Sequence, residues 1–123
     1  SVFIVSSEEK EISLVVMSNA DLGRPRGCSF SKTVKLALAT GLKRCPAEVG
    51  PQLRQQYPDQ PYDERLLIAM EPIVDSGDRG DSRMFCVGYG DGWVHASKGR
   101  WLSGMISHSD FHWGGTELFV FCK

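Results

Sequence analysis

The chain has 123 residues, the length of one domain, and its 41% hydrophobic and 24% charged residues are typical of a globular protein and exclude a disordered one. Fourteen Lys and Arg against fifteen Asp and Glu give a net charge of −1, which removes the electrostatic argument for nucleic-acid binding. The longest apolar runs, Leu66–Met70 and Leu118–Cys122, are too short to cross a membrane as a helix. We therefore expect one domain over residues 1–123, with neither nucleic acid nor membrane as a partner.

The first expected elements are two strands. Val2–Val5 is a short apolar run, and Glu11–Met17 carries apolar residues at every second position. This period of two predicts a β-hairpin. Residues 18–28 are rich in Asn, Asp, Gly and Pro, a composition typical of a loop.

Two helices are expected next. A stripe of apolar or small residues recurs every three or four positions: Phe30, Val34, Ala37, Leu38, Gly41, Leu42 and Cys45. This spacing predicts a long helix over Ser31–Arg44, capped by Ser29 or Ser31 and ended by Pro46. A shorter helix is expected over Pro51–Tyr57, with proline in its first turn.

The second half of the chain is predicted to be strands separated by short turns. These strands are Arg65–Val74, Arg83–Tyr89, Trp93–Ala96, Trp101–Ile106 and Thr116–Cys122. Pro72 places the first of them at a sheet edge or a bulge. Short turns connect antiparallel neighbours, so we expect an α+β domain with a twisted, mainly antiparallel sheet of five to seven strands. One long and one short helix should pack on one face of it.

The apolar pattern also predicts a core and an assembly. The core is expected to contain Phe3, Leu14, Val16, Val34, Leu38, Leu42, Leu53, Leu67, Phe85, Val87, Leu118 and Val120. Residues 84–87 and 118–122 are apolar on both faces, whereas a small helix pair covers only one face. A symmetric homodimer would bury the other face.

The cysteines indicate a reducing compartment. No two of them form a C-x-x-C pair, and their positions are Cys28, Cys45, Cys86 and Cys122. Val2–Val5 is too short for a signal peptide and has no basic flank. We expect a cytoplasmic protein whose thiols are small buried hydrophobes, whereas a secreted protein would allow three disulfide connectivities.

Chemistry-bearing residues concentrate in one segment. Residues 88–115 contain all three Trp, all three His and seven of the thirteen Gly. Trp and His combine an apolar body with a polar tip, and glycine lets a ligand approach the backbone, so the segment is typical of a binding site. The alternative is packing, in which aromatic side chains cover bare glycines in curved strands.

The expected ligand follows from charge. Residues 57–123 hold six Lys and Arg against ten Asp and Glu, and both aromatic faces and carboxylates attract cations. We therefore expect a cationic or flat aromatic small molecule as the partner. The candidate ligand-binding residues are Tyr89, Asp91, Trp93, His95, Trp101, His112 and Trp113.

The sequence also allows two catalytic alternatives, a metal site and a thiol–imidazole pair. His108, Asp110 and His112 alternate along the chain, so in a strand they would share a face and could hold zinc or iron, although the neighbouring serines favour a solvated turn. Cys86 and His95 lie in consecutive expected strands and could form a thiol–imidazole pair.

Neither catalytic motif has a recognisable flanking signature, and Cys28, near the expected helix start, has none either. No Walker loop, dinucleotide fingerprint or serine elbow is present in the sequence, so no cofactor and no catalytic residue are expected. The texture of residues 46–54 and 113–122 is typical of short bacterial proteins and implies no activity. The leading hypothesis is a non-catalytic module that binds a small ligand or a protein partner. The alternative is a small hydrolase-like enzyme that uses Cys and His or a metal.

Overall fold

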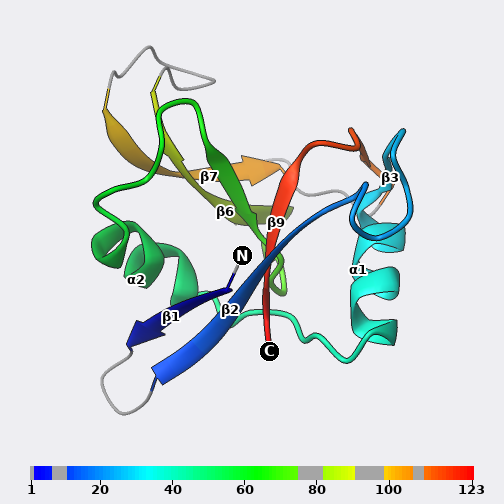
Figure 1. The fold of residues 1–123 in the computed structure, drawn as a ribbon, viewed down its shortest axis with the longest axis horizontal. Helices are drawn as coiled ribbons and strands as arrows, with labels where there is room; N and C mark the ends of the chain where they lie inside the picture. The colour runs from blue at the N-terminus through cyan, green and yellow to red at the C-terminus, as the bar shows by residue number, and fades with distance from the viewer. Residues whose placement is uncertain (1, 7–10, 75–81, 91–98, 107–109) are drawn as a thin grey trace.

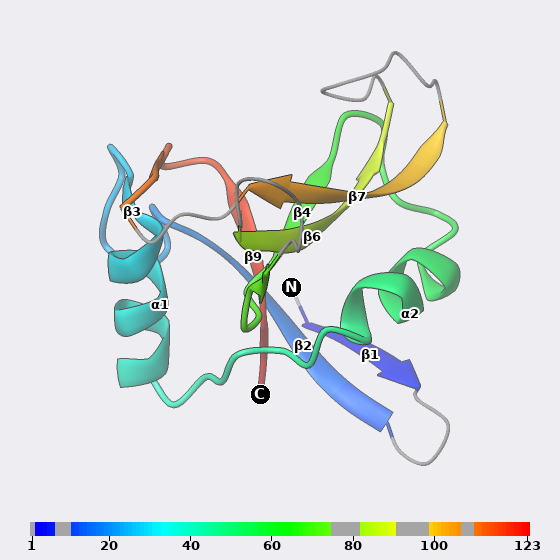
Figure 2. The same ribbon diagram turned by 180° about the vertical axis from the view of Figure 1, so that it is seen from behind.

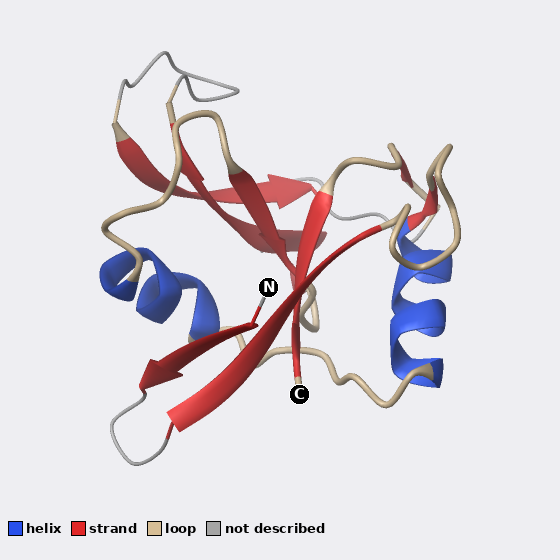
Figure 3. Ribbon diagram, viewed as in Figure 1, coloured by secondary structure: helices blue, strands red, loops and turns tan. Residues whose placement is uncertain are grey.

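The computed structural model describes residues 2–6, 11–74, 82–90, 99–106 and 110–123 (Figures 1 and 3). The elements, in chain order, are β1 (Val2–Ser6), β2 (Glu11–Ser18), β3 (Cys28–Ser29), α1 (Phe30–Ala39), α2 (Val49–Gln56), β4 (Arg65–Ile68), β5 (Ile73–Val74), β6 (Ser82–Tyr89), β7 (Arg100–Ile106), β8 (His112–Trp113) and β9 (Leu118–Cys122). Within these ranges, neither helix has the length and apolarity that a membrane span requires.

Seven of the described strands form one sheet, ordered β1-β2-β9-β4-β6, with β5 and β7 also paired to β6. β3 and β8 form a separate two-stranded ribbon. All pairs are antiparallel except β4 with β9, which are parallel and far apart in the chain. The expected class, an α+β domain with a mainly antiparallel sheet, is confirmed, and so is the β1–β2 hairpin.

The long helix starts as predicted and ends early. The side chain of Ser29 caps α1 by accepting a hydrogen bond from the Lys32 backbone N–H at 3.2 Å. Thr40 then closes the helix, and Gly41 adopts a φ of 94°, a left-handed conformation that ends helices and suits glycine. Residues 42–45 are extended instead and pair with the end of β9 and with Met70. The apolar stripe of the sequence runs past Gly41, whereas the helix ends before it.

The two helices lie on opposite sides of the sheet (Figures 1 and 2). α1 packs through Phe30 against Phe119, with ring centroids 6.0 Å apart, while α2 brings Gly50 directly against the ring of Phe85. Phe119 pairs with Leu67, and Leu67 pairs with Cys86, so these three side chains lie on the same face of the sheet. Phe85 is one residue before Cys86, so its side chain lies on the opposite face. The placement of both helices on one face, expected from sequence, therefore does not describe this fold.

The sheet curls around α2. This helix contacts β6 and β7 near one end of the strand order and β1 at the other end, which requires a strongly curved sheet. With α1 on the outer side, the central strands are covered on both faces. β4 and β9 accordingly contain runs of fully buried apolar residues, and the largest of these side chains are Leu66, Leu67, Ile68, Phe119 and Phe121.

Most of the predicted core is confirmed. Six of its residues are buried, namely Leu14, Val34, Leu53, Leu67, Val87 and Val120. Val16, Leu42, Phe85 and Leu118 are partly buried against that core. The prediction for Leu38 is wrong, because its side chain is 42% exposed on α1, and the side chain of Phe3 lies outside what the structure describes.

The apolar runs at 84–87 and 118–122 bury themselves within one chain. Met84, Cys86 and Val87 are at most 1% exposed, and so are Phe119 and Phe121. The covering of both sheet faces by α1 and α2 explains these runs without a second copy. The homodimer stays a prediction, but an uncovered apolar sheet face no longer supports it.

Candidate functional site

The described part of the aromatic segment is organised by the β6–β7 hairpin. The two strands pair from Arg83 with Ile106 to Tyr89 with Arg100, so the last pair stands at the hairpin end. Just beyond it, the Gly90 backbone N–H donates to the Gly99 carbonyl at 3.0 Å. The chain therefore leaves the sheet at Tyr89 and returns beside it at Arg100.

Part of the predicted site falls in the connection between these strands. Residues 91–98 lie outside the described residues, and they include the site candidates Asp91, Trp93 and His95. The described residues that flank this connection, Gly90 and Gly99, are hydrogen-bonded neighbours at the hairpin end.

Tyr62, Tyr89 and Arg100 contact one another in sequence at this end, with Tyr89 in the middle, and we call this group the tyrosine platform. The rings of Tyr62 and Tyr89 meet edge to face, with centroids 5.3 Å apart and planes at 80°. The guanidinium carbon of Arg100 lies 4.2 Å from the centroid of the Tyr89 ring, which is a cation–π contact. Tyr62 is 58% exposed, so the platform faces solvent.

The loop between α2 and β4 holds Tyr62 in place, and it runs beside the hairpin end in both views (Figures 1 and 2). The Asp63 backbone N–H donates to the Tyr89 carbonyl at 2.8 Å, and the Tyr89 N–H donates to the Glu64 carbonyl at 3.2 Å. Gly90 has a φ of 114°, and a Cβ there would lie 3.0 Å from the Asp63 carboxylate. Glycine is required at this point because the two loops approach so closely.

Arg54 of α2 binds the β6–β7 hairpin through hydrogen bonds. Its Nη1 donates to the carbonyl of Gly88 and to Oε1 of Gln60, each at 2.7 Å, and its Nη2 donates to the Tyr57 carbonyl at 2.9 Å. Burial lowers the pKa of this guanidinium, and repulsion from Arg100 lowers it further. Two arginine charges therefore lie near the platform, that of the partly buried Arg54 and that of the exposed Arg100.

Trp101 lies next to the platform and rests on a glycine. It is the cross-strand partner of Gly88, and a Cβ at that position would overlap the indole ring. This is the arrangement expected from packing, in which an aromatic ring covers a bare glycine. The indole Nε1 is buried, and within the described ranges it has no hydrogen-bond partner.

Trp113, the third tryptophan, lies in the core beside α1. It is 4% exposed and packs against Phe119 at a centroid distance of 6.2 Å and against Phe111 at 4.8 Å. Its backbone carbonyl accepts a hydrogen bond from the buried Asn19 side chain at 3.2 Å. The indole therefore has no open face for a ligand in this fold.

The metal candidates are only partly described. Asp110 and His112 are both exposed, and His112 lies in β8 as the partner of Ser29. His108 lies outside the described residues. Within the described ranges, no group of three His, Cys, Asp or Glu side chains is placed to hold a metal ion.

The cysteines considered as nucleophiles, Cys28 and Cys86, are buried. Cys86 is fully buried in β6, and burial raises the pKa of its thiol to about 12, which disfavours the thiolate that nucleophilic attack requires. Cys28 is 9% exposed, and its sulfur lies 3.3 Å from the Thr33 hydroxyl and 3.6 Å from the Asn19 side-chain oxygen. These contacts fix Cys28 in a polar network at the start of α1.

Three contributors to this site were missed from sequence: Arg54, Tyr62 and Arg100. Tyr62 and Arg54 are 27 and 35 residues before Tyr89 in the chain, so no local pattern joins them to the aromatic segment. A weak signal existed for Arg100, since it directly precedes Trp101 at the start of an expected strand. A strand pairing derived from sequence would have placed it opposite Tyr89.

No family model, curated protein or solved structure matches the chain. The fold and the platform therefore define the class of protein by themselves: a small α+β domain with a solvent-facing aromatic and guanidinium group at a hairpin end.

Proposed function

We propose that this protein is a non-catalytic binding module for flat aromatic small molecules, with the tyrosine platform as its site. The observation that carries the proposal is the stack of Arg100 over Tyr89 at 4.2 Å beside the exposed ring of Tyr62. A ring held in place before binding loses little conformational entropy when a ligand stacks on it. Trp93 and His95, which lie outside the described residues, stay candidate members of the site.

The stack also narrows the class of ligand. From sequence, a cation and a flat aromatic fitted equally well. Arg100 already occupies one face of Tyr89, so a cationic ligand would compete with it and be repelled by its charge. A planar ring with an anionic substituent can instead stack on the platform and pair with the guanidinium.

The catalytic alternative has less support. The buried Cys86 thiol, with its pKa raised to about 12, is a poor nucleophile at neutral pH. The metal alternative rests on His108, Asp110 and His112, of which the two described members are exposed. Stoichiometric zinc or iron in the purified protein would support the enzyme hypothesis over the binding module.

Fluorescence titration tests the proposal, with naphthalene-2-sulfonate as the probe and cyclohexanesulfonate and choline as its non-aromatic counterparts. We expect the naphthalene probe alone to bind, with a Kd in the micromolar range or weaker, since each stacked contact contributes about 0.5–2 kcal/mol. Tyr62→Ala and Arg100→Ala should each weaken binding by about tenfold.

Phe111→Ala is the matched control, because Phe111 is also an exposed aromatic, at 47%, but lies beside Trp113. It should leave the Kd unchanged. Equal binding of all three compounds, or equal loss in the Phe111 and Tyr62 variants, contradicts the proposal.

Location and assembly are also part of the proposal. A cytoplasmic location is supported by the four cysteines, none of which forms a disulfide bond in the structure. The homodimer has no separate support from the described contacts, and sedimentation of the purified chain tests it.

A further inference from the structure

A cavity of about 620 Å³ lies away from the tyrosine platform, where the start of β2, the segment after α1 and the end of β9 meet. It is lined by Glu11, Ile12, Ser13, Lys43, Arg44, Pro46, Cys122 and Lys123, and we call it the basic pocket. Its volume lies in the range of small-molecule sites.

Positive charge dominates the basic pocket. The lining holds three residues with cationic side chains, Lys43, Arg44 and Lys123, and one with an acidic side chain, Glu11. Arg44 is engaged by Glu71 outside the pocket at 2.7 Å, which leaves the two lysine ammonium groups to act on its contents. A ligand that carries carboxylates is favoured there over a neutral or cationic one.

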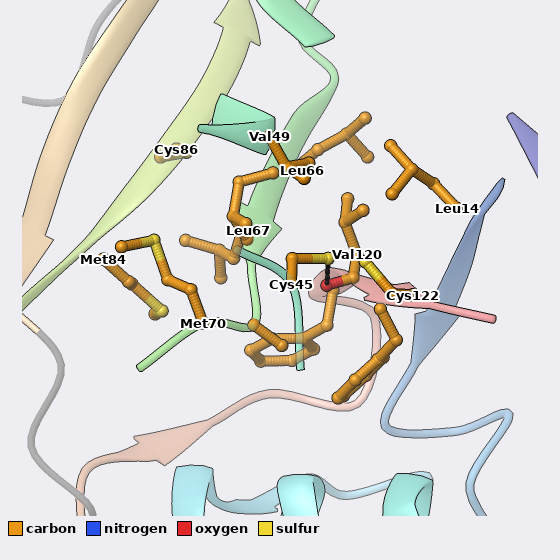
Figure 4. Close-up of a cluster of buried hydrophobic side chains, with 14 of the residues drawn as sticks. Leu14, Cys45, Val49, Leu66, Leu67, Met70, Met84, Cys86, Val120 and Cys122 are labelled. Carbon is orange, nitrogen blue, oxygen red and sulfur yellow. Dashed lines mark hydrogen bonds between the residues drawn. The ribbon is translucent and has the colours of Figure 1, made fainter. Parts of the chain in front are cut away.

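Cys122 lines the pocket, and its side chain is hydrogen-bonded to that of a second cysteine, Cys45. Cys122 is 7% exposed and Cys45 is 3% exposed. Figure 4 shows the sulfur atoms of Cys45 and Cys122 pointing toward one another, and the Cys45 thiol also contacts the Val120 carbonyl at 3.5 Å. Two facing thiols at the edge of a cavity are an arrangement that packing alone does not require.

Backbone pairing fixes both cysteines. Cys122 exchanges two hydrogen bonds with Lys43, of 2.7 and 2.8 Å, and the Cys45 N–H donates to the Ala69 carbonyl at 2.7 Å. The two sulfurs are thus held together by strands that are already paired. Little rearrangement is needed for one thiol to follow the other in a reaction.

The two thiols are not equivalent. Its hydrogen bond with Cys122, together with burial, raises the pKa of Cys45 far above its ordinary value, so Cys45 keeps its proton. Cys122 lines the basic pocket and Cys45 does not, so a molecule in the pocket meets Cys122 first. Cys122 is therefore the attacking sulfur and Cys45 the resolving one.

We propose that Cys122 and Cys45 form a redox-active dithiol, oxidised to a disulfide by small anionic disulfides that enter the basic pocket. The Cys122 thiolate attacks one sulfur of the incoming disulfide, forming a mixed disulfide and releasing one thiolate, which takes up a proton. Cys45 then loses its proton and attacks the sulfur of Cys122, which releases the second thiolate. In sum, one protein dithiol and one small disulfide give one protein disulfide and two small thiols.

Peptide mass mapping of the native chain after incubation with oxidised glutathione, followed by alkylation, tests the proposal. We expect a peptide pair linked through Cys45 and Cys122 to form first. Cys45→Ser should stop the reaction at the mixed disulfide on Cys122. Cys28 is an internal control, because at 9% exposure it is slightly more accessible than Cys122 but has neither the pocket nor a facing thiol. If Cys28 reacts faster, or if Cys122 is modified without linkage to Cys45, the proposal is wrong.

The role of the pocket is tested separately by charge. Lys43→Gln combined with Lys123→Gln should slow oxidation by oxidised glutathione about tenfold. The same variant should react at the wild-type rate with the neutral bis(2-hydroxyethyl) disulfide, which also shows that the fold is intact. Equal slowing with both reagents contradicts recruitment by the basic pocket.

Discussion

Two tryptophans from the same aromatic segment have opposite surroundings. Trp113 is enclosed by Phe111 and Phe119 at the α1 side of the sheet, and it is 4% exposed. Trp101 lies over Gly88 on the β6–β7 hairpin, half-buried and adjacent to the solvent-facing platform. The same residue type serves the core in one region and borders the candidate site in the other.

The two regions also differ in how their polar groups are satisfied. Around Trp113, the fully buried Asn19 donates to two backbone carbonyls, and its side-chain oxygen accepts from the Thr33 hydroxyl at 2.6 Å. This network is closed. Near Trp101, burial lowers the pKa of the Arg54 guanidinium, and repulsion from the charge of Arg100 lowers it further. A hydrogen-bond network whose polar groups are all paired stabilises one packing of the core. Two neighbouring positive charges instead create a local potential that favours a bound anion.

The largest expected effect is that of Trp113→Ala. Removal of a fully enclosed indole leaves a cavity and should lower the free energy of unfolding by about 3–5 kcal/mol. Urea unfolding measures it, with Phe111→Ala as the control on an exposed neighbouring ring, expected to cost much less. If Trp101→Ala costs more than Trp113→Ala, the assignment of the two tryptophans is reversed.

The next effect is that of Gly88→Ala. The added methyl group overlaps the Trp101 indole, so the ring must move, and we expect a loss of about 1–3 kcal/mol together with weaker binding at the platform. Gly104→Ala on the same hairpin is the matched control, since its Cβ would meet only Arg83 Cδ at 3.6 Å, an ordinary contact. Thermal unfolding of the two variants separates overpacking from a general effect of losing glycine. Equal stabilities would show that Trp101 is not held on Gly88.

The smallest effect concerns alkaline pH. Burial, and then a hydrogen bond to Glu64, raises the pKa of Tyr57 to about 12 from an ordinary value of 10. The unfolded chain ionises first, so this contribution to stability is complete below pH 10 and is lost between pH 10 and about 12. Tyr57→Phe should therefore lose less stability across that window than wild type, as measured by urea unfolding at each pH. Tyr62→Phe, on an exposed ring, should follow wild type, and identical slopes for Tyr57→Phe and wild type would contradict the prediction.

Helix boundaries show where sequence reasoning reached its limit. The start of α1 was predictable, because Ser29 acts through a local hydrogen bond to its own first turn. Its end was not, because Gly41 fits the apolar stripe as well as it fits a left-handed end. Residues 42–45 gain backbone partners only from β9 and Met70, which are distant in sequence. Leu38 became exposed because the α1 face that contacts the core is narrower than the stripe suggests.

The candidate site was predictable only in part. Tyr89 and Trp101 were both named as site candidates at the ends of expected strands, but the direct pairing of those two strands was not predicted, because a further strand was expected between them. Arg54 and Asp63, the neighbour of Tyr62, reach the hairpin through tertiary hydrogen bonds to its carbonyls, which no spacing in the sequence encodes.

The sequence alone determined the α+β class, the first hairpin and most of the core, because these depend on periodicity and on the transfer of apolar side chains from water. Only the tertiary structure decided that the two helices cover opposite faces, that Trp113 is core and that Tyr62 and Arg100 flank Tyr89. It likewise decided that the thiols of Cys45 and Cys122 face each other. These features depend on which distant strands pair, and the parallel pairing of β4 with β9 is set by the packing of the whole chain rather than by any local segment.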